Sequence, residues 1–187
     1  MVPVMSLWLP ILLSAVAVFV ASSVIHMVLA YHRSDYAKLP DEEGVMAALR
    51  KAAVPPGDYV FPKPDSMKAM KDPAFLKTWS EGPVGMMTVM KKADAPSMGK
   101  PLGLWFLYCV VVSVFAALVA GSALPSNSPF ASVFHFAALT AFVAHGLGIW
   151  PTTIWYGRSW TTSLKSTIDG LIYALVTGAV FGWLWPK

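Results

Sequence analysis

The sequence predicts an all-α membrane protein, in which four transmembrane helices form an antiparallel bundle with a cytoplasmic insertion of about 70 residues between the first and second helices. Two observations predict this class. Of the 187 residues, 56% are apolar and only 13% are charged, which is unlike the composition of a water-soluble domain. Four apolar runs are also long enough, at about 1.5 Å per residue, to cross a hydrocarbon core roughly 30 Å thick.

The apolar runs divide the chain into three parts. Residues 1–31 hold the first transmembrane helix, which we interpret as a retained anchor because no Lys or Arg precedes its apolar core. Residues 32–101 form the polar segment. Residues 102–187 hold three further transmembrane helices, expected over residues 102–124, 130–150 and 164–185.

The distribution of positive charge predicts the orientation of these helices. Thirteen Lys and Arg residues lie in the two segments that follow the first and third helices, whereas none lies before the first helix or between the second and third. Since positive residues favour the cytoplasmic side, we expect residues 32–101 in the cytoplasm and both termini outside. Lys187, at the outer end, is the one exception.

The polar segment carries signals for short elements. Acids at the start and bases at the end predict a helix from about Asp41 to Ala53. A second short helix is expected over Ser66 to Ser80, and the extended pieces Tyr59–Phe61 and Val84–Met90 could pair. Mixed charges here argue against a nucleic-acid partner. Because this segment can form only a thin core of its own, we expect it to lie against the membrane face or against a partner.

The last helix presents two kinds of residue at helical spacing. Small residues recur every fourth position and predict a face on which a neighbouring backbone approaches closely: Gly170, Ala174, Gly178 and Gly182. Asp169 and Tyr173 lie one turn apart beside that face. An acid within a membrane is costly and turns inward to a partner or a cavity.

Each of the four helices offers one polar or ligand-type side chain at a similar depth. Counted from the cytoplasmic ends of the helices, His26, Cys109, His145 and Asp169 all lie roughly 7 to 10 Å below the interface. Three interpretations follow. The first is structural hydrogen bonding between helices. The second is a proton or ion path that uses Asp169, His145 and His26. The third is a metal or haem site, with His26 and His145 as the candidate ligands.

Four stretches of the sequence together resemble a family of small, uncharacterised four-span proteins of the bacterial inner membrane. These stretches are PPGDYVFP, GPVGMMTVM, GLWFLYCVVVSVFAA and DGLIYALVTGAVFGWLWP. The resemblance covers most of the chain and implies a multi-pass protein of the bacterial inner (plasma) membrane. It implies no activity, cofactor or partner, and it transfers no site residue.

The sequence favours a non-catalytic role over an enzymatic one. It contains no phosphate-binding loop, no HExxH motif and no nucleophile with a base at a recognisable spacing. Helices rich in small residues could continue their packing onto another protein, so we expect a structural or accessory subunit in the lipid bilayer, within a larger membrane complex or a homo-oligomer. The alternatives are a small transporter or proton-coupled channel, and a metal or haem protein. No cofactor is predicted outside that last alternative.

Overall fold

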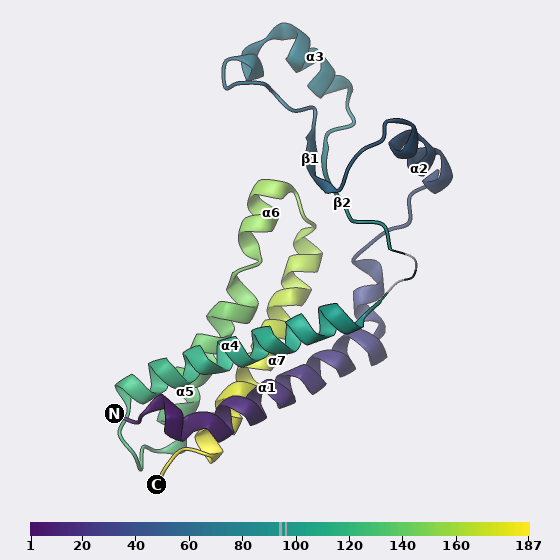
Figure 1. The fold of residues 1–187 in the computed structure, drawn as a ribbon. Helices are drawn as coiled ribbons and strands as arrows, with labels where there is room; N and C mark the ends of the chain where they lie inside the picture. The colour runs from purple at the N-terminus through teal and green to yellow at the C-terminus, as the bar shows by residue number, and fades with distance from the viewer. Residues whose placement is uncertain (94, 96) are drawn as a thin grey trace. The chain divides into compact units, whose positions relative to one another are not determined.

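The computed structural model describes residues 1–93, 95 and 97–187, and it divides into two compact units. One unit comprises Met1–Ala37 together with Ser97–Lys187, and it contains all of the long helices. The other unit comprises Lys38–Pro96 and is built from short elements. Figure 1 shows the order of these elements along the chain.

The larger unit contains four helices that are long and apolar enough to cross a membrane: Val4–Val28, Gly99–Ala123, Phe130–Tyr156 and Trp160–Trp183. The mostly helical, multi-span class predicted from the sequence is thereby confirmed. The third helix is longer than the expected residues 130–150, because the aromatic stretch after it continues as α6 (Trp150–Tyr156). This helix ends at Gly157, whose left-handed backbone (φ 68°) suits a residue without a side chain.

The first and third spans are each interrupted by one wider helical turn. The first span runs as a short 3-10 turn, then α1 (Trp8–Ser23), then a π turn over Val24–Val28. The third runs as α5 (Phe130–Phe142), then a π turn over Val143–Leu147, before α6. Such single π turns inside helices are frequent at functional sites. The second and fourth spans are the uninterrupted helices α4 (Gly99–Ala123) and α7 (Trp160–Trp183).

Close packing of α7 against the third span depends on small residues. A Cβ atom added at Gly170 would lie 2.5 Å from Gly146 Cα, and one added at Gly178 would lie 2.8 Å from the Ala138 side chain. Ala174 is buried between these two glycines. In this structure the small residues of α7 therefore face a neighbouring backbone, which is how helices associate in a membrane.

The remaining helix contacts are mainly apolar, with a few buried polar pairs. Helices α1 and α4 lie side by side (Figure 1), and between them the hydroxyl of Ser14 donates to that of Ser113 at 2.9 Å. Both side chains are fully buried. Near the start of α7, the hydroxyl of Ser163 is hydrogen-bonded to the hydroxyl of Thr153 in α6. These pairs satisfy polar groups that would be costly to leave unpaired away from water.

Large apolar side chains are exposed along all four spans. Examples from the four helices in turn are Leu12, Leu107, Leu139 and Leu171, each more than a third exposed. A water-soluble protein rarely exposes so much contiguous apolar surface. These exposed faces suit a lipid environment.

The smaller unit has no buried residue among its described positions 38–93. Strand β1 (Gly57–Phe61) pairs antiparallel with β2 (Gly85–Val89), so that Tyr59 is opposite Met87. The pairing expected from the sequence is therefore present. Two short helices, α2 (Glu42–Lys51) and α3 (Pro73–Glu81), are each capped by an Asp side chain that accepts a backbone N–H.

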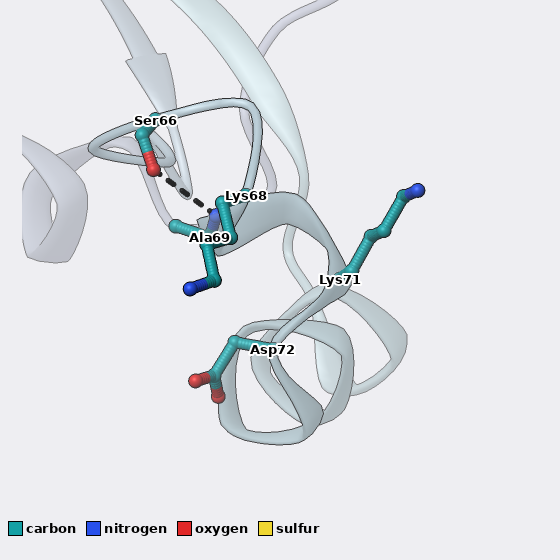
Figure 2. Close-up of a pocket in the computed structure, with 5 residues that line it drawn as sticks. All are labelled: Ser66, Lys68, Ala69, Lys71 and Asp72. Carbon is teal, nitrogen blue, oxygen red and sulfur yellow. Dashed lines mark hydrogen bonds between the residues drawn. The ribbon is translucent and has the colours of Figure 1, made fainter.

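The smaller unit also has a hollow, which Figure 2 shows, lined by Ser66, Lys68, Ala69, Lys71 and Asp72. Two of the polar side chains that line it accept hydrogen bonds from backbone N–H groups close by in the sequence. The Ser66 hydroxyl accepts from the Ala69 N–H at 3.1 Å, and Asp72 accepts from the Ala74 N–H at 2.8 Å. The lysine side chains of Lys68 and Lys71 extend in different directions (Figure 2). The hollow therefore has no convergent set of polar groups.

Candidate functional site

One cavity in the larger unit collects most of the polar residues singled out from the sequence. The cavity has a volume of about 540 Å³. His26, His145, Asp169 and Tyr173 line it, whereas Cys109 is buried among the apolar residues that contact Tyr173. The complete lining, which we call the interhelical cavity, consists of Ser22, Ser23, His26, Met27, Met98, Pro101, Leu102, Trp105, His145, Ser166, Asp169 and Tyr173.

Aromatic rings form one side of the interhelical cavity. The His145 ring lies edge-on to the rings of Trp105, Tyr108 and Tyr173, with ring centroids 5.3 to 5.8 Å apart. The indole N–H of Trp105 donates to the Ser22 hydroxyl at 2.8 Å, which ties α4 to α1. The Tyr108 hydroxyl donates to the backbone carbonyl of Ala144 at 2.8 Å. The position of the His145 ring is therefore fixed by packing on three sides.

Two polar atoms on the lining side chains are left without partners. The Nδ1 atom of His145 and the hydroxyl of Tyr173 are buried and have no hydrogen-bond partner among the described residues. Tyr173 as a whole is only 4% exposed. A buried polar group without a partner costs about 1 to 3 kcal/mol, so such groups are uncommon in folded proteins.

Asp169 is held at the edge of the cavity by two side chains from the segment that follows the first span. Its Oδ1 atom accepts a hydrogen bond from the Tyr31 hydroxyl. Its Oδ2 atom lies 2.8 Å from Nε2 of His32. The other ring nitrogen of His32, Nδ1, lies 2.6 Å from Oδ2 of Asp35. The two ring nitrogens of His32 thus connect the carboxylate of Asp169 to that of Asp35.

Lys165 completes this group of residues, which we call the polar network: Tyr31, His32, Asp35, Lys165 and Asp169. Its ammonium group donates to the Tyr31 carbonyl at 2.6 Å, and to the Ser34 hydroxyl and Asp35 Oδ1 at 2.8 Å each. Burial alone raises the pKa of Asp35. Hydrogen bonds from His32 and Lys165, together with their positive charges, outweigh burial and hold this pKa below its ordinary value.

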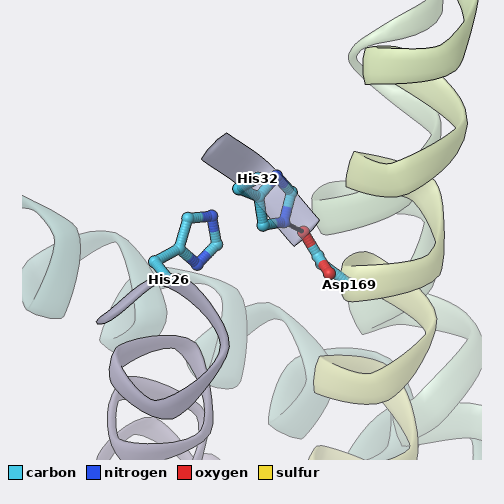
Figure 3. Close-up of side chains that lie close together, drawn as sticks. All are labelled: His26, His32 and Asp169. Carbon is cyan, nitrogen blue, oxygen red and sulfur yellow. Dashed lines mark hydrogen bonds and ion pairs between the residues drawn. The ribbon is translucent and has the colours of Figure 1, made fainter. Parts of the chain in front are cut away.

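His26 lies directly beside the polar network. Its Nδ1 atom donates to the backbone carbonyl of Ser22 at 3.0 Å, which leaves Nε2 as the ring nitrogen not used by that bond. Its ring stacks on that of His32, with centroids 4.5 Å apart and planes 8° apart. Figure 3 shows His26 and His32 adjacent, with Asp169 reaching His32 from α7. One potential ligand atom from each of these three residues lies within 4.8 Å of the others.

The break after the first span explains why His32 reaches Asp169. The sequence predicts that the first transmembrane helix continues to Tyr31. In the structure the π turn ends at Val28, and Leu29 has an extended backbone (φ −79°, ψ 133°) before a 3-10 turn over Ala30–Ser34 begins. The extended residue changes the direction of the chain and brings His32 next to Asp169.

Sequence reasoning therefore missed four members of the polar network. Lys165 enters it only as one of the positive charges that predict the topology, and Tyr31, His32 and Asp35 have no role in it. The cluster of potential ligands contains His32 beside His26, whereas His145, the other metal candidate, is surrounded by aromatic rings. The stretch from Tyr31 to Asp35 places a Tyr, a His and an Asp directly after the first span, and an intramembrane acid elsewhere in the chain needs such partners.

No protein-family model matches the chain, and no curated protein sequence or solved structure matches it. The function is therefore argued from the cavity and from the residues around it.

Proposed function

We propose that the chain is a multi-pass protein of a bacterial inner membrane, related to the small four-span proteins that it resembles. In this proposal its spans form an antiparallel bundle with residues 32–101 in the cytoplasm. The charge distribution supports this orientation. Two backbone bonds support the placement of both termini on one side: the Val2 N–H donates to the Gly121 carbonyl at 2.8 Å, and the Asn127 N–H donates to the Pro186 carbonyl at 2.9 Å. Both ends of the chain thus adjoin the loop that begins where α4 ends.

Within this membrane setting, the protein acts as a non-catalytic accessory protein that binds a lipid-phase molecule in the interhelical cavity. The unpartnered His145 Nδ1 and Tyr173 hydroxyl carry this proposal. A ligand that accepted a hydrogen bond from Tyr173 would remove the cost of leaving that group unpaired. The cavity volume of about 540 Å³ is in the usual range for small-molecule sites, roughly 300 to 1,000 Å³.

The lining defines the chemistry of the ligand. Tyr173 offers a hydroxyl donor, and the ring of His145 lies beside it. Met27, Met98 and Leu102 supply apolar walls. The ligand therefore has a head group with a carbonyl-type oxygen and an apolar remainder. A quinone with an alkyl tail has this chemistry, and so has the ester region of a phospholipid.

Native mass spectrometry of the detergent-purified protein tests the proposal. The wild-type protein should carry a small molecule, and Tyr173→Phe should lose most of it, because one hydrogen bond of about 1 kcal/mol corresponds to roughly a fivefold change in affinity. Tyr108→Phe is the matched control, since Tyr108 belongs to the same aromatic group but does not line the cavity. The mass of the bound species distinguishes a quinone from a phospholipid.

A titration with decylubiquinone gives the second readout. Wild type and Tyr108→Phe should bind it saturably, and Tyr173→Phe should bind it several-fold more weakly. Absence of any bound species together with absence of saturable binding would refute the proposal, as would equal binding by the two variants.

One observation favours a second function, a proton path. His32 connects Asp169, which lines the cavity, to Asp35 beyond the end of the first span. Protons can move along a series of hydrogen bonds that links a carboxylate, an imidazole and a second carboxylate. Protein reconstituted in vesicles with an internal pH dye would then conduct protons, and Asp169→Asn would be folded but inactive. A rate equal to that of empty vesicles would exclude this function.

A further inference from the structure

We infer that His26, His32 and Asp169 form a binding site for a divalent transition-metal ion. The three residues supply two imidazoles and one carboxylate, a ligand set that suits Zn²⁺, Fe²⁺ or Co²⁺. Their potential ligand atoms lie within 4.8 Å of one another. Ligand atoms around a tetrahedral zinc ion are roughly 3.3 Å apart, given metal–ligand distances of about 2.0 to 2.1 Å. Only a small closure of the cluster is therefore required.

The surroundings of the three residues resemble those of metal ligands. Each residue has its remaining polar atom fixed by a partner of the kind that orients ligands in known sites. The Nδ1 atom of His26 bonds the Ser22 carbonyl at 3.0 Å, and the Nδ1 atom of His32 bonds Asp35 at 2.6 Å. The Oδ1 atom of Asp169 accepts from the Tyr31 hydroxyl. These bonds leave the Nε2 atoms of both histidines and Oδ2 of Asp169 as the three metal-binding atoms.

The three ligands differ in how far they are enclosed. His32 and Asp169 are held by the polar network, with side chains only 11% and 4% exposed. His26 is exposed and lines the interhelical cavity. A small shift of His26 toward the pair formed by His32 and Asp169 would close the cluster around the ion. The remaining coordination position would then face the cavity.

The charges around the cluster favour a cation. Two carboxylates, Asp35 and Asp169, and one ammonium group, Lys165, lie at or beside it, which is an excess of one negative charge before the imidazoles are counted. A divalent ion would coordinate Nε2 of His32 and Oδ2 of Asp169 in place of the hydrogen bond between them.

Titration of the purified full-length protein with Co²⁺ tests the inference, because bound Co²⁺ has a visible spectrum that reports its ligands. We expect one Co²⁺ per chain, displaced by Zn²⁺. His26→Gln should weaken binding at least tenfold. This variant should fold, since the hydrogen bond of His26 lies within its own helix and its side chain is exposed. His135→Gln is the control, because His135 is exposed on α5 and lies outside the cluster.

Sub-stoichiometric binding, or equal affinity in wild type and His26→Gln, would overturn the inference. The site does not depend on the ligand proposed for the interhelical cavity. Tyr173→Phe should lose that ligand and keep the metal. His32→Gln should do the reverse, since His32 does not line the cavity. Failure of one proposal is thus distinguishable from failure of the other.

Discussion

Replacing Gly170 by Ala should separate α7 from the third span and disturb the cavity. The added Cβ would lie 2.5 Å from Gly146 Cα, 2.6 Å from Gly146 N and 2.8 Å from the carbonyl carbon of His145. All three atoms are backbone, so no side-chain rotation can relieve the contact. An ordinary contact needs at least 3.4 Å, and the two segments must therefore move apart by nearly 1 Å. Because His145 is in the displaced segment, its ring should move as well.

The size of the effect follows from a matched control. Gly103 is also in a long helix, but a Cβ added there meets nothing within 4 Å. Both substitutions gain the same helix propensity of about 1 kcal/mol. Only Gly170→Ala carries an overpacking cost of about 1 to 3 kcal/mol. The two variants should therefore differ by roughly 3 to 10 °C in melting temperature, as expected for a chain of this length. Thermal unfolding in detergent measures this difference. Equal melting temperatures would refute the assignment of Gly170 to a helix contact.

Three further predictions concern the polar network and the packing of α7. Asp169→Leu should cost about 1 to 3 kcal/mol, because it leaves Nε2 of the largely buried His32 without a partner, whereas Asp169→Asn should cost less, since an amide can still form a hydrogen bond with that nitrogen; equal unfolding free energies would contradict this. Hydrogen bonds and positive charges from His32 and Lys165 lower the pKa of Asp35 in the folded protein, so its contribution to stability should be present above the pKa of the unfolded chain and lost as the pH falls through the lower folded-state pKa. Asp35→Asn should lose this acid-dependent part of the melting profile, and an unchanged profile would count against the network. Gly178→Leu should unfold more readily than Val180→Leu, because only Gly178 faces the Ala138 side chain at 2.8 Å; similar melting curves would argue against that contact.

The helical class and the strand pairing could be predicted from the sequence because both depend on local pattern. Apolar runs of sufficient length predict membrane-spanning helices, and Tyr59–Phe61 and Val84–Met90 are extended pieces that could pair. Counting along the helices predicts a similar depth for His26, Cys109, His145 and Asp169. The structure places His26, His145 and Asp169 on one cavity, whereas Cys109 is not part of its lining.

The partners of Asp169 could not be predicted in the same way. Counting assumed that the first helix continued to Tyr31, but the helical turns end at Val28 and Leu29 is extended. Residues 24–30 contain no Gly or Pro, so no helix-breaking residue in the sequence marks the position of that break. The bend is specified by contacts far along the chain, in which His32 meets Asp169 and Lys165 meets Asp35. Long-range pairing of this kind leaves little local signal in a single sequence.

A double-mutant cycle between His32 and Asp169 tests most directly the claim that these residues meet at the edge of the cavity. The stabilities of wild type, His32→Ala, Asp169→Ala and the double variant would be measured by reversible unfolding in mixed detergent micelles. Since Nε2 and Oδ2 lie 2.8 Å apart, the two substitutions should be coupled by about 1 to 3 kcal/mol. Additive effects, within about 0.3 to 0.5 kcal/mol, would show that the two side chains do not interact and would contradict the account.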